Sequence, residues 1–63
     1  MIVVRPGPLM KELGVNRHGL KIMRERQGFP NPIRLGERSV GYLREEVDAW
    51  LEQRKAERDA AAA

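Results

Sequence analysis

The spacing of apolar residues near the start of the chain predicts a short first helix. Leu9 and Leu13 lie one helical turn apart, which indicates a helix with one apolar face. We expect Gly7 to cap this helix and Pro8 to occupy its first position, where the missing N–H of proline costs nothing. Gly14 is expected to end it in the left-handed conformation that glycine tolerates.

Residues 16–27 predict a second helix with one apolar and one polar side. Asn16 can cap it by accepting a hydrogen bond from a free N–H of the first turn. Leu20, Met23 and Gln27 share the side that faces the core. The outward side contains Arg17, His18, Lys21, Ile22 and Glu25. Two helices joined by a tight turn, with basic residues at the start of the second, are typical of a helix-turn-helix that reads the major groove.

Two residues of this second helix depart from a simple amphipathic pattern. Gly19 stands inside the helix, where glycine costs about 1 kcal/mol relative to alanine. We expect it to allow close approach of the neighbouring helix, with a functional kink as the alternative. Ile22 is apolar on the outward side, where it can meet a thymine methyl group, contact another protein molecule or lie free on the surface.

A two-stranded β-hairpin is predicted after the second helix. Gly28 ends that helix, and the prolines within residues 29–32 keep the following chain extended. Period-two alternation predicts four inward side chains, which are Ile33, Leu35, Val40 and Tyr42. Residues 36–39 form the expected turn, and Arg34 points outward. The hairpin therefore has the form of a basic wing beside the helix-turn-helix.

A final helix is predicted to begin at Leu43 or Arg44, because acidic residues follow at once and stabilise a helix N-terminus. Its apolar stripe consists of Leu43, Val47, Trp50 and Leu51. We expect Trp50, the largest apolar group, to seal this helix over the hairpin and the first helices. Residues 54–63 lack the stripe and are expected to project as a helical or frayed tail. Residues 1–4 can form either an edge strand or an ordered arm.

The composition sets limits on this architecture. A chain of 63 residues allows one domain, spanning residues 1–63, with a small core. There is no cysteine, so neither a disulfide nor a cysteine-based zinc site can reinforce it. No apolar run approaches the ~20 residues of a membrane span, and the first four residues are too short for a signal peptide. We expect a cytoplasmic α+β domain, mostly helical, with the fold of a small winged helix-turn-helix.

Charge is divided unevenly along the chain. Residues 1–44 contain nine Lys or Arg and three Asp or Glu, whereas residues 45–63 contain three and six. A basic part joined to an acidic last helix suits a protein that meets phosphates on one side only. Taken singly, Arg5, Lys11 and Arg44 are expected to be ordinary solvated residues.

Candidate contacts to double-stranded DNA fall on the second helix and on the wing. The candidate DNA contacts at the start of the second helix are Asn16, Arg17, His18 and Lys21, and the last three are the residues expected to reach base edges. The residues expected to contact phosphates or the adjacent minor groove are Arg24, Arg34, Arg38 and Ser39.

Catalytic and metal-binding roles are not expected. His18 is the only histidine and there is no cysteine, so the sequence offers neither a cluster of such metal ligands nor a nucleophile with its base. Glu45 and Glu46 match the chemistry of a helix start rather than acid–base catalysis. We therefore expect no enzyme activity, no cofactor and no small-molecule substrate.

Four motifs resemble one family of small regulators. They are GVNR at 14–17, GFPNPIRLG at 28–36, RSVGY at 38–42 and EVDAWL at 46–51. Over about residues 8–54 the chain is similar to the AlpA family of prophage and mobile-element regulators, which is related in fold to excisionases and to the DNA-binding part of MerR-type proteins. The resemblance implies site-specific DNA binding that activates or represses genes of the element, or that bends DNA to direct excision.

The alternative to a DNA-binding regulator is a protein-interaction adaptor or a phage packaging subunit that reuses the same fold. It is motivated by the apolar Ile22 and the acidic tail. For the DNA-binding hypothesis, a single module covers only ~600 to 1,000 Å² of protein surface. We therefore expect either several copies on repeated sites or a homodimer on a two-part site.

Overall fold

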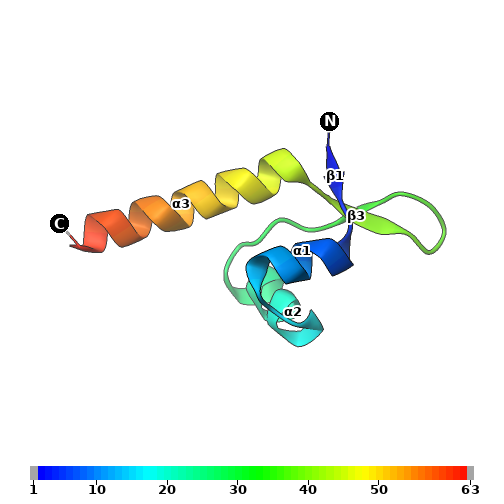
Figure 1. The fold of residues 1–63 in the computed structure, drawn as a ribbon, viewed down its shortest axis with the longest axis horizontal. Coiled ribbons are helices and arrows are strands. Elements are labelled where there is room, and N and C mark those ends of the chain that lie inside the picture. Colours follow the sequence, from blue (N-terminus) through cyan, green and yellow to red (C-terminus); the bar gives the residue numbers. More distant parts are fainter. Residues whose placement is uncertain (1, 63) are drawn as a thin grey trace.

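The computed structural model describes residues 2–62, which form three helices and three short strands (Figure 1). In chain order the elements are β1 (Val3–Val4), α1 (Pro6–Leu13), α2 (Arg17–Arg26), β2 (Ile33–Arg34), β3 (Val40–Leu43) and α3 (Arg44–Ala62). The strands form one antiparallel sheet in the order β1-β3-β2. The predicted α+β winged helix-turn-helix is confirmed, and β1 adds an edge strand to its hairpin.

The core is built from single residues of different segments. Its buried members are Val4, Leu9, Leu20, Phe29, Tyr42 and Val47. Phe29 belongs to the segment that the sequence marked only as an extended connection. Gly28 turns the chain with a φ of 72°, and the Phe29 N–H donates to the Met23 carbonyl oxygen at 3.2 Å. This ending of α2 directs Phe29 inward, where its ring centroid lies 5.7 Å from that of Tyr42.

The corner between α1 and α2 has the predicted local chemistry. Gly14 is left-handed, with a φ of 69°, and its N–H donates to carbonyl oxygens of the last turn of α1. The Asn16 side chain accepts a hydrogen bond of 2.7 Å from the Gly19 N–H and so caps α2. The start of α1 differs from the prediction, because the Leu9 N–H already donates to the Arg5 carbonyl oxygen. The helix therefore begins at Pro6, with Arg5 as the capping residue.

The need for glycine at position 19 comes from the first turn of α2 and not from a neighbouring helix. A Cβ atom at this position would lie 3.3 Å from the Val15 Cβ and 3.3 Å from the Asn16 Oδ1. Both distances are tighter than ordinary van der Waals contact. The predicted close approach is real, but its partner is the cap that begins α2.

The hairpin register differs by one residue from the predicted alternation. Arg34 pairs with Val40 and Ile33 pairs with Gly41. Directly paired residues point to the same face, so Arg34 shares the face of Val40 and Tyr42, and Ile33 lies on the opposite face. Residues 35–39 connect the two strands instead of the predicted 36–39, and within this connection Leu35 and Gly36 both donate to the Ser39 carbonyl oxygen.

The consequence for the hairpin is a less buried wing than the sequence predicted. Leu35 is 44% exposed and Val40 is 37% exposed. Of the four side chains predicted to face inward, only Tyr42 is fully buried. The hairpin extends beyond the two helices of the helix-turn-helix (Figure 1).

The helix α3 begins at Arg44 as predicted, but its apolar stripe is short. Val47 is fully buried, whereas Leu51 is 39% exposed. Trp50 packs edge-on against Phe29, with 4.9 Å between ring centroids, and its Nε1 donates to the Gln27 carbonyl oxygen at 3.0 Å. Trp50 therefore seals α3 over the end of α2 and Phe29 rather than over the hairpin and α1.

The end of α2 receives a second donor from α3. The Arg54 guanidinium donates to the same Gln27 carbonyl oxygen at 2.8 Å and lies 4.9 Å from the centre of the Trp50 ring. The Gln27 side chain is exposed, contrary to its predicted place on the core side, because α2 ends at Arg26 and Gln27 serves as the cap. Beyond Gln53 the described side chains of α3 are exposed, and the helix projects away from the body (Figure 1).

Arg44 is a structural residue rather than the solvated one expected. Its guanidinium contacts the Glu12 carboxylate of α1 at 2.6 and 3.3 Å and Asp48 of α3 at 3.5 Å. The hydrogen bond from Arg44 holds the pKa of Glu12 below its usual value. Because Glu12 and Arg44 belong to different helices, this ion pair fixes α3 against α1 at the point where α3 begins.

Replacing Leu9 by alanine is expected to unfold most of the domain. Deletion of a buried leucine side chain costs about 2–5 kcal/mol, which is comparable to the whole stability of so small a domain. Leu51→Ala is the matched control, since that leucine is 39% exposed, and it is expected to cost much less. Urea unfolding followed by circular dichroism compares the two variants. Equal losses of unfolding free energy would contradict the assigned core.

The ion pair between Glu12 and Arg44 predicts an acid-sensitive contribution to stability. Since the pKa of Glu12 is lowered in the folded state, its contribution is present above the pKa of the unfolded chain and is lost as the pH falls through the folded pKa. The difference in unfolding free energy between the wild type and Glu12→Gln should therefore shrink in acid. Glu37→Gln is the control, because Glu37 makes no ion pair among residues 2–62. A difference for Glu12→Gln that stays constant from about pH 7 to about pH 3 would refute the assignment.

Candidate nucleic-acid interface

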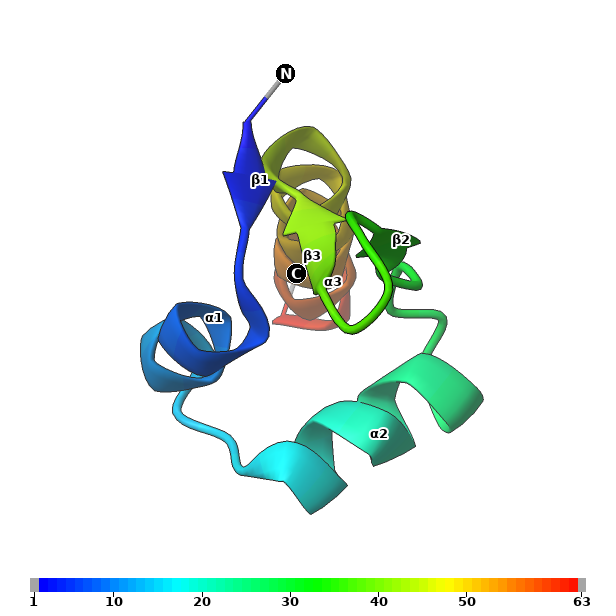
Figure 2. The same cartoon turned by 90° about the vertical axis from the view of Figure 1, so that its right-hand side faces the viewer.

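The helix α2 presents its polar side to solvent. Figure 2 shows α2 along the lower side of the molecule, below the sheet and beside α1. Arg17, His18 and Lys21 are exposed, whereas Leu20 is buried, so the helix has the predicted facing. Ile22, expected on the exposed side, is half-buried.

The cationic groups of α2 differ in how strongly the protein holds them. The Lys21 ammonium lies 4.0 Å from the Glu25 carboxylate, and both side chains are largely exposed. An exposed pair of this kind contributes little to stability, so the ammonium stays available to an anion. Arg24 is half-buried, in keeping with its predicted position at the boundary between the two faces.

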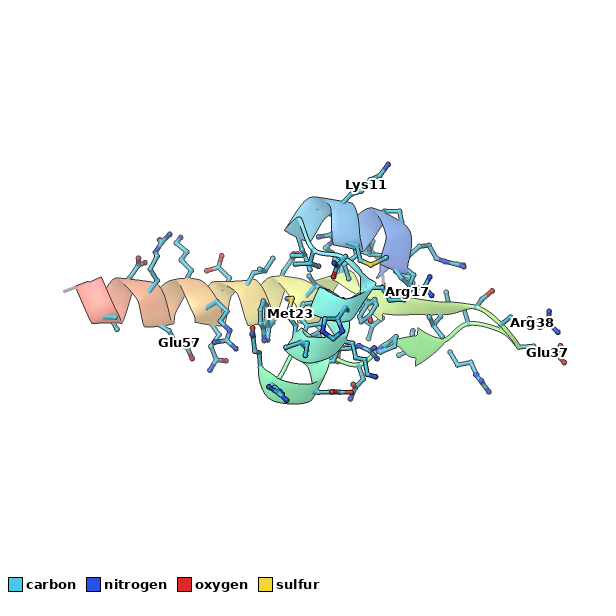
Figure 3. All side chains as sticks on the ribbon, turned by 90° about the horizontal axis from the view of Figure 1, so that it is seen from below. Lys11, Arg17, Met23, Glu37, Arg38 and Glu57 are labelled. Atoms are coloured by element: carbon cyan, nitrogen blue, oxygen red, sulfur yellow. The ribbon has the colours of Figure 1, made fainter. Side chains whose placement is uncertain are left out.

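The hairpin supplies two further arginines. Arg34 is exposed and shares the sheet face of Tyr42, which is the face turned toward the helices. Arg38 lies at the hairpin tip beside Glu37 (Figure 3). Ser39 is half-buried, and its carbonyl oxygen closes the turn.

The basic residues of α2 and of the hairpin lie away from the projecting part of α3. Viewed from below, Arg17 lies on α2 and Arg38 at the hairpin tip, whereas Glu57 lies on the projecting part of α3 (Figure 3). The hairpin and the C-terminal end of α3 point in opposite directions (Figure 1). The acidic residues of α3 lie mostly in its first half, because four of its six fall within residues 45–52, whereas residues 54–62 carry three Lys or Arg and two Asp or Glu.

A cleft of about 380 Å³ opens between the start of α1, α2 and the hairpin. Its lining includes Pro6, Met10, Arg17, Arg24, Val40 and Tyr42. The Arg24 Nε is buried and has no hydrogen-bond partner among the described residues. Burial raises the pKa of the Tyr42 hydroxyl, and the positive charge of Arg24 opposes this rise.

Sequence reasoning identified the arginines of this cleft but not Tyr42. The alternation of the hairpin marked Tyr42 as a core residue, and its ring is indeed in the core. Its hydroxyl takes part in none of the side-chain hydrogen bonds among residues 2–62. A tyrosine at an inward position, where phenylalanine would fill the same space, was the signal in the sequence.

Within residues 2–62, no three His, Cys, Asp or Glu side chains gather in a way that could hold a metal ion. None of the described helices has the length and apolar character needed to cross a membrane.

Comparison with known proteins identifies the family. No curated protein and no solved structure matches the chain. The family model described as "Prophage CP4-57 regulatory protein (AlpA)" matches residues 4–55. This match begins at Val4 in β1 and ends at Lys55 in α3, so it includes α1, α2, the hairpin and the part of α3 that packs on the core. The chain belongs to the AlpA family of prophage regulatory proteins.

Proposed function

We propose that the chain binds specific sites on double-stranded DNA, as a transcriptional regulator or excisionase of a prophage or other mobile element. One observation carries the proposal: exposed cationic side chains lie on both α2 and the hairpin, whereas α3 beyond Arg44 carries six Asp or Glu against three Lys or Arg. Membership of a family of prophage regulators supports the same function. The binding unit proposed is one domain, residues 1–63.

In this proposal α2 enters the major groove, which is wide enough to admit a helix. Its first turn carries Arg17 and His18, and Lys21 follows on the next turn. Arginine and lysine donate well to the acceptors of guanine, so these residues read base edges. The Asn16 side chain is engaged as the cap, and its role is to hold the start of α2 in place.

The hairpin contacts the DNA beside α2. Arg34 and Arg38 neutralise phosphates or enter the adjacent minor groove, where the negative potential favours arginine. Ser39 adds a neutral hydrogen bond to a phosphate, and Arg24 contacts a phosphate from the boundary of α2. The acidic part of α3 stays away from the duplex, because its charge would be repelled.

One copy of so small a domain has too little contact surface for high specificity. A single module covers ~600 to 1,000 Å² of protein surface, well below the area of large dimeric complexes. We therefore propose that several copies bind repeated sites, or that a dimer binds a two-part site.

Two arginine variants test the assignment of base and phosphate contacts. Arg17→Ala should reduce the preference for the selected site over random duplex by about 1–3 kcal/mol, because it removes a base contact. Arg38→Ala should weaken binding to all duplexes equally and lower the slope of log affinity against log salt by about one. Sites are first obtained by selection from a random duplex library, and affinities are then measured over a range of salt concentrations.

The control for these variants is Lys55→Ala, which removes a positive charge from the projecting part of α3. It should leave affinity and salt dependence close to those of the wild type. The proposed interface would be ruled out if duplex affinity did not fall as the salt concentration rises. It would also be ruled out if Lys55→Ala and Arg17→Ala lost equal amounts of affinity for the selected site.

Substitution of Asn16 separates its capping role from the electrostatics of the interface. Asn16→Ala should lower the unfolding free energy by about 1 kcal/mol, since the cap is lost. Asn16→Asp should keep the stability, because aspartate caps equally well, yet should weaken DNA binding by placing a negative charge at the start of α2. Thermal unfolding and duplex titration measure the two effects. Wild-type affinity in Asn16→Asp would show that this end of α2 does not approach phosphates.

A further inference from the structure

We propose that the cleft between α1, α2 and the hairpin binds one phosphodiester of the DNA backbone, with the Tyr42 hydroxyl and the Arg24 guanidinium as its ligands. The inference rests on the proposed DNA-binding function and adds a contact that the exposed basic residues do not include. It assigns Tyr42 a second role beside its place in the core.

The first support is that Arg24 has a hydrogen-bond donor without an acceptor. Its Nε is buried without a hydrogen-bond partner, and the guanidinium takes part in no ion pair among residues 2–62. By contrast, Arg44 and Arg54 donate to protein oxygens. A half-buried guanidinium with unpaired donors is costly unless an acceptor is supplied. A phosphate supplies several acceptor oxygens together with the opposite charge.

The second support is the position of the Tyr42 hydroxyl. The ring packs in the core at 5.7 Å from Phe29, which fixes it. The residue lines the same cleft as Arg24, and its hydroxyl, like that of any tyrosine whose pKa is not lowered, is protonated at neutral pH and can donate. Since the hydroxyl has no partner among the described side chains, it can donate to an anion without breaking a hydrogen bond of the protein.

The walls of the cleft favour a sugar–phosphate over a bare anion. Pro6, Met10, Pro32 and Val40 line it together with the polar groups. These apolar side chains match the carbon face of a deoxyribose, while Arg24 and Tyr42 match the attached phosphate. Arg17 also lines the cleft, so the strand that enters it runs beside the start of α2. The proposed phosphate contact therefore lies next to the residues of α2 that are proposed to read base edges.

The test combines a minimal variant with a modified duplex. Tyr42→Phe removes one oxygen and keeps the ring, so the thermal unfolding midpoint should be unchanged while affinity for the selected duplex falls about tenfold. Methylphosphonates, which are neutral, replace the phosphates of that duplex one at a time. One position should weaken the wild type strongly and Tyr42→Phe little, because the two changes remove the same contact.

A second variant tests the guanidinium. Arg24→Lys keeps the charge but loses the planar set of donors, and it should lose sensitivity at the same methylphosphonate position as Tyr42→Phe. Lys55→Gln is the control, and its methylphosphonate profile should equal that of the wild type. The expected result is thus one shared phosphate position for Tyr42 and Arg24.

The outcomes separate this inference from the proposed function. If the wild type binds duplex with the expected salt dependence but Tyr42→Phe has the same affinity and the same methylphosphonate profile, only the phosphate cleft is overturned. Another outcome is that Arg24→Lys and Tyr42→Phe lose their sensitivity to methylphosphonate at two different phosphate positions. In that case the two residues do not share a phosphate, and the inference fails. If the wild type binds no duplex, both proposals fail together.

Discussion

The structure depends on a very small core to which nearly every segment contributes one side chain. Leu9 of α1, Leu20 of α2, Tyr42 of β3 and Val47 of α3 are buried, together with Val4 and Phe29. With no disulfide available, each of these side chains carries a large share of the stability of so small a domain. The relative placement of α2 and the hairpin, on which DNA binding would depend, is therefore set by the same few contacts that keep the chain folded.

Polar contacts at the edge of this core determine the direction of α3. The Arg44–Glu12 ion pair holds its first turn to α1, and Trp50 and Arg54 both donate to the carbonyl oxygen that ends α2. The negative end of the α2 dipole thus receives a cationic side chain. Two attachments on different helices leave α3 little freedom to rotate, and its outer part projects away from the hairpin (Figure 1).

The sequence predicted those features whose causes are local. Gly14 and Asn16 determine the corner between α1 and α2 through their own backbone and side-chain chemistry, and both behave as predicted. The hairpin register was wrong, because it depends on the length of the turn and not on alternation within a strand. The roles of Phe29 and Arg44 were missed for a related reason. Each role depends on a partner distant in sequence, and no periodicity reveals such a partner.

The same distinction applies to the candidate interface. The basic residues of α2 and the hairpin could be selected from the sequence, because charge and helical facing are local properties. The cleft could not, since it exists only where α1, α2 and β3 meet. Tyr42 belongs both to the core and to the cleft. Its ring packs on Phe29 in the core, and the same residue lines the cleft with Arg24. A contact to a phosphate at this point would therefore act on a side chain that cannot move without disturbing the core, which favours a fixed position of the protein on its duplex.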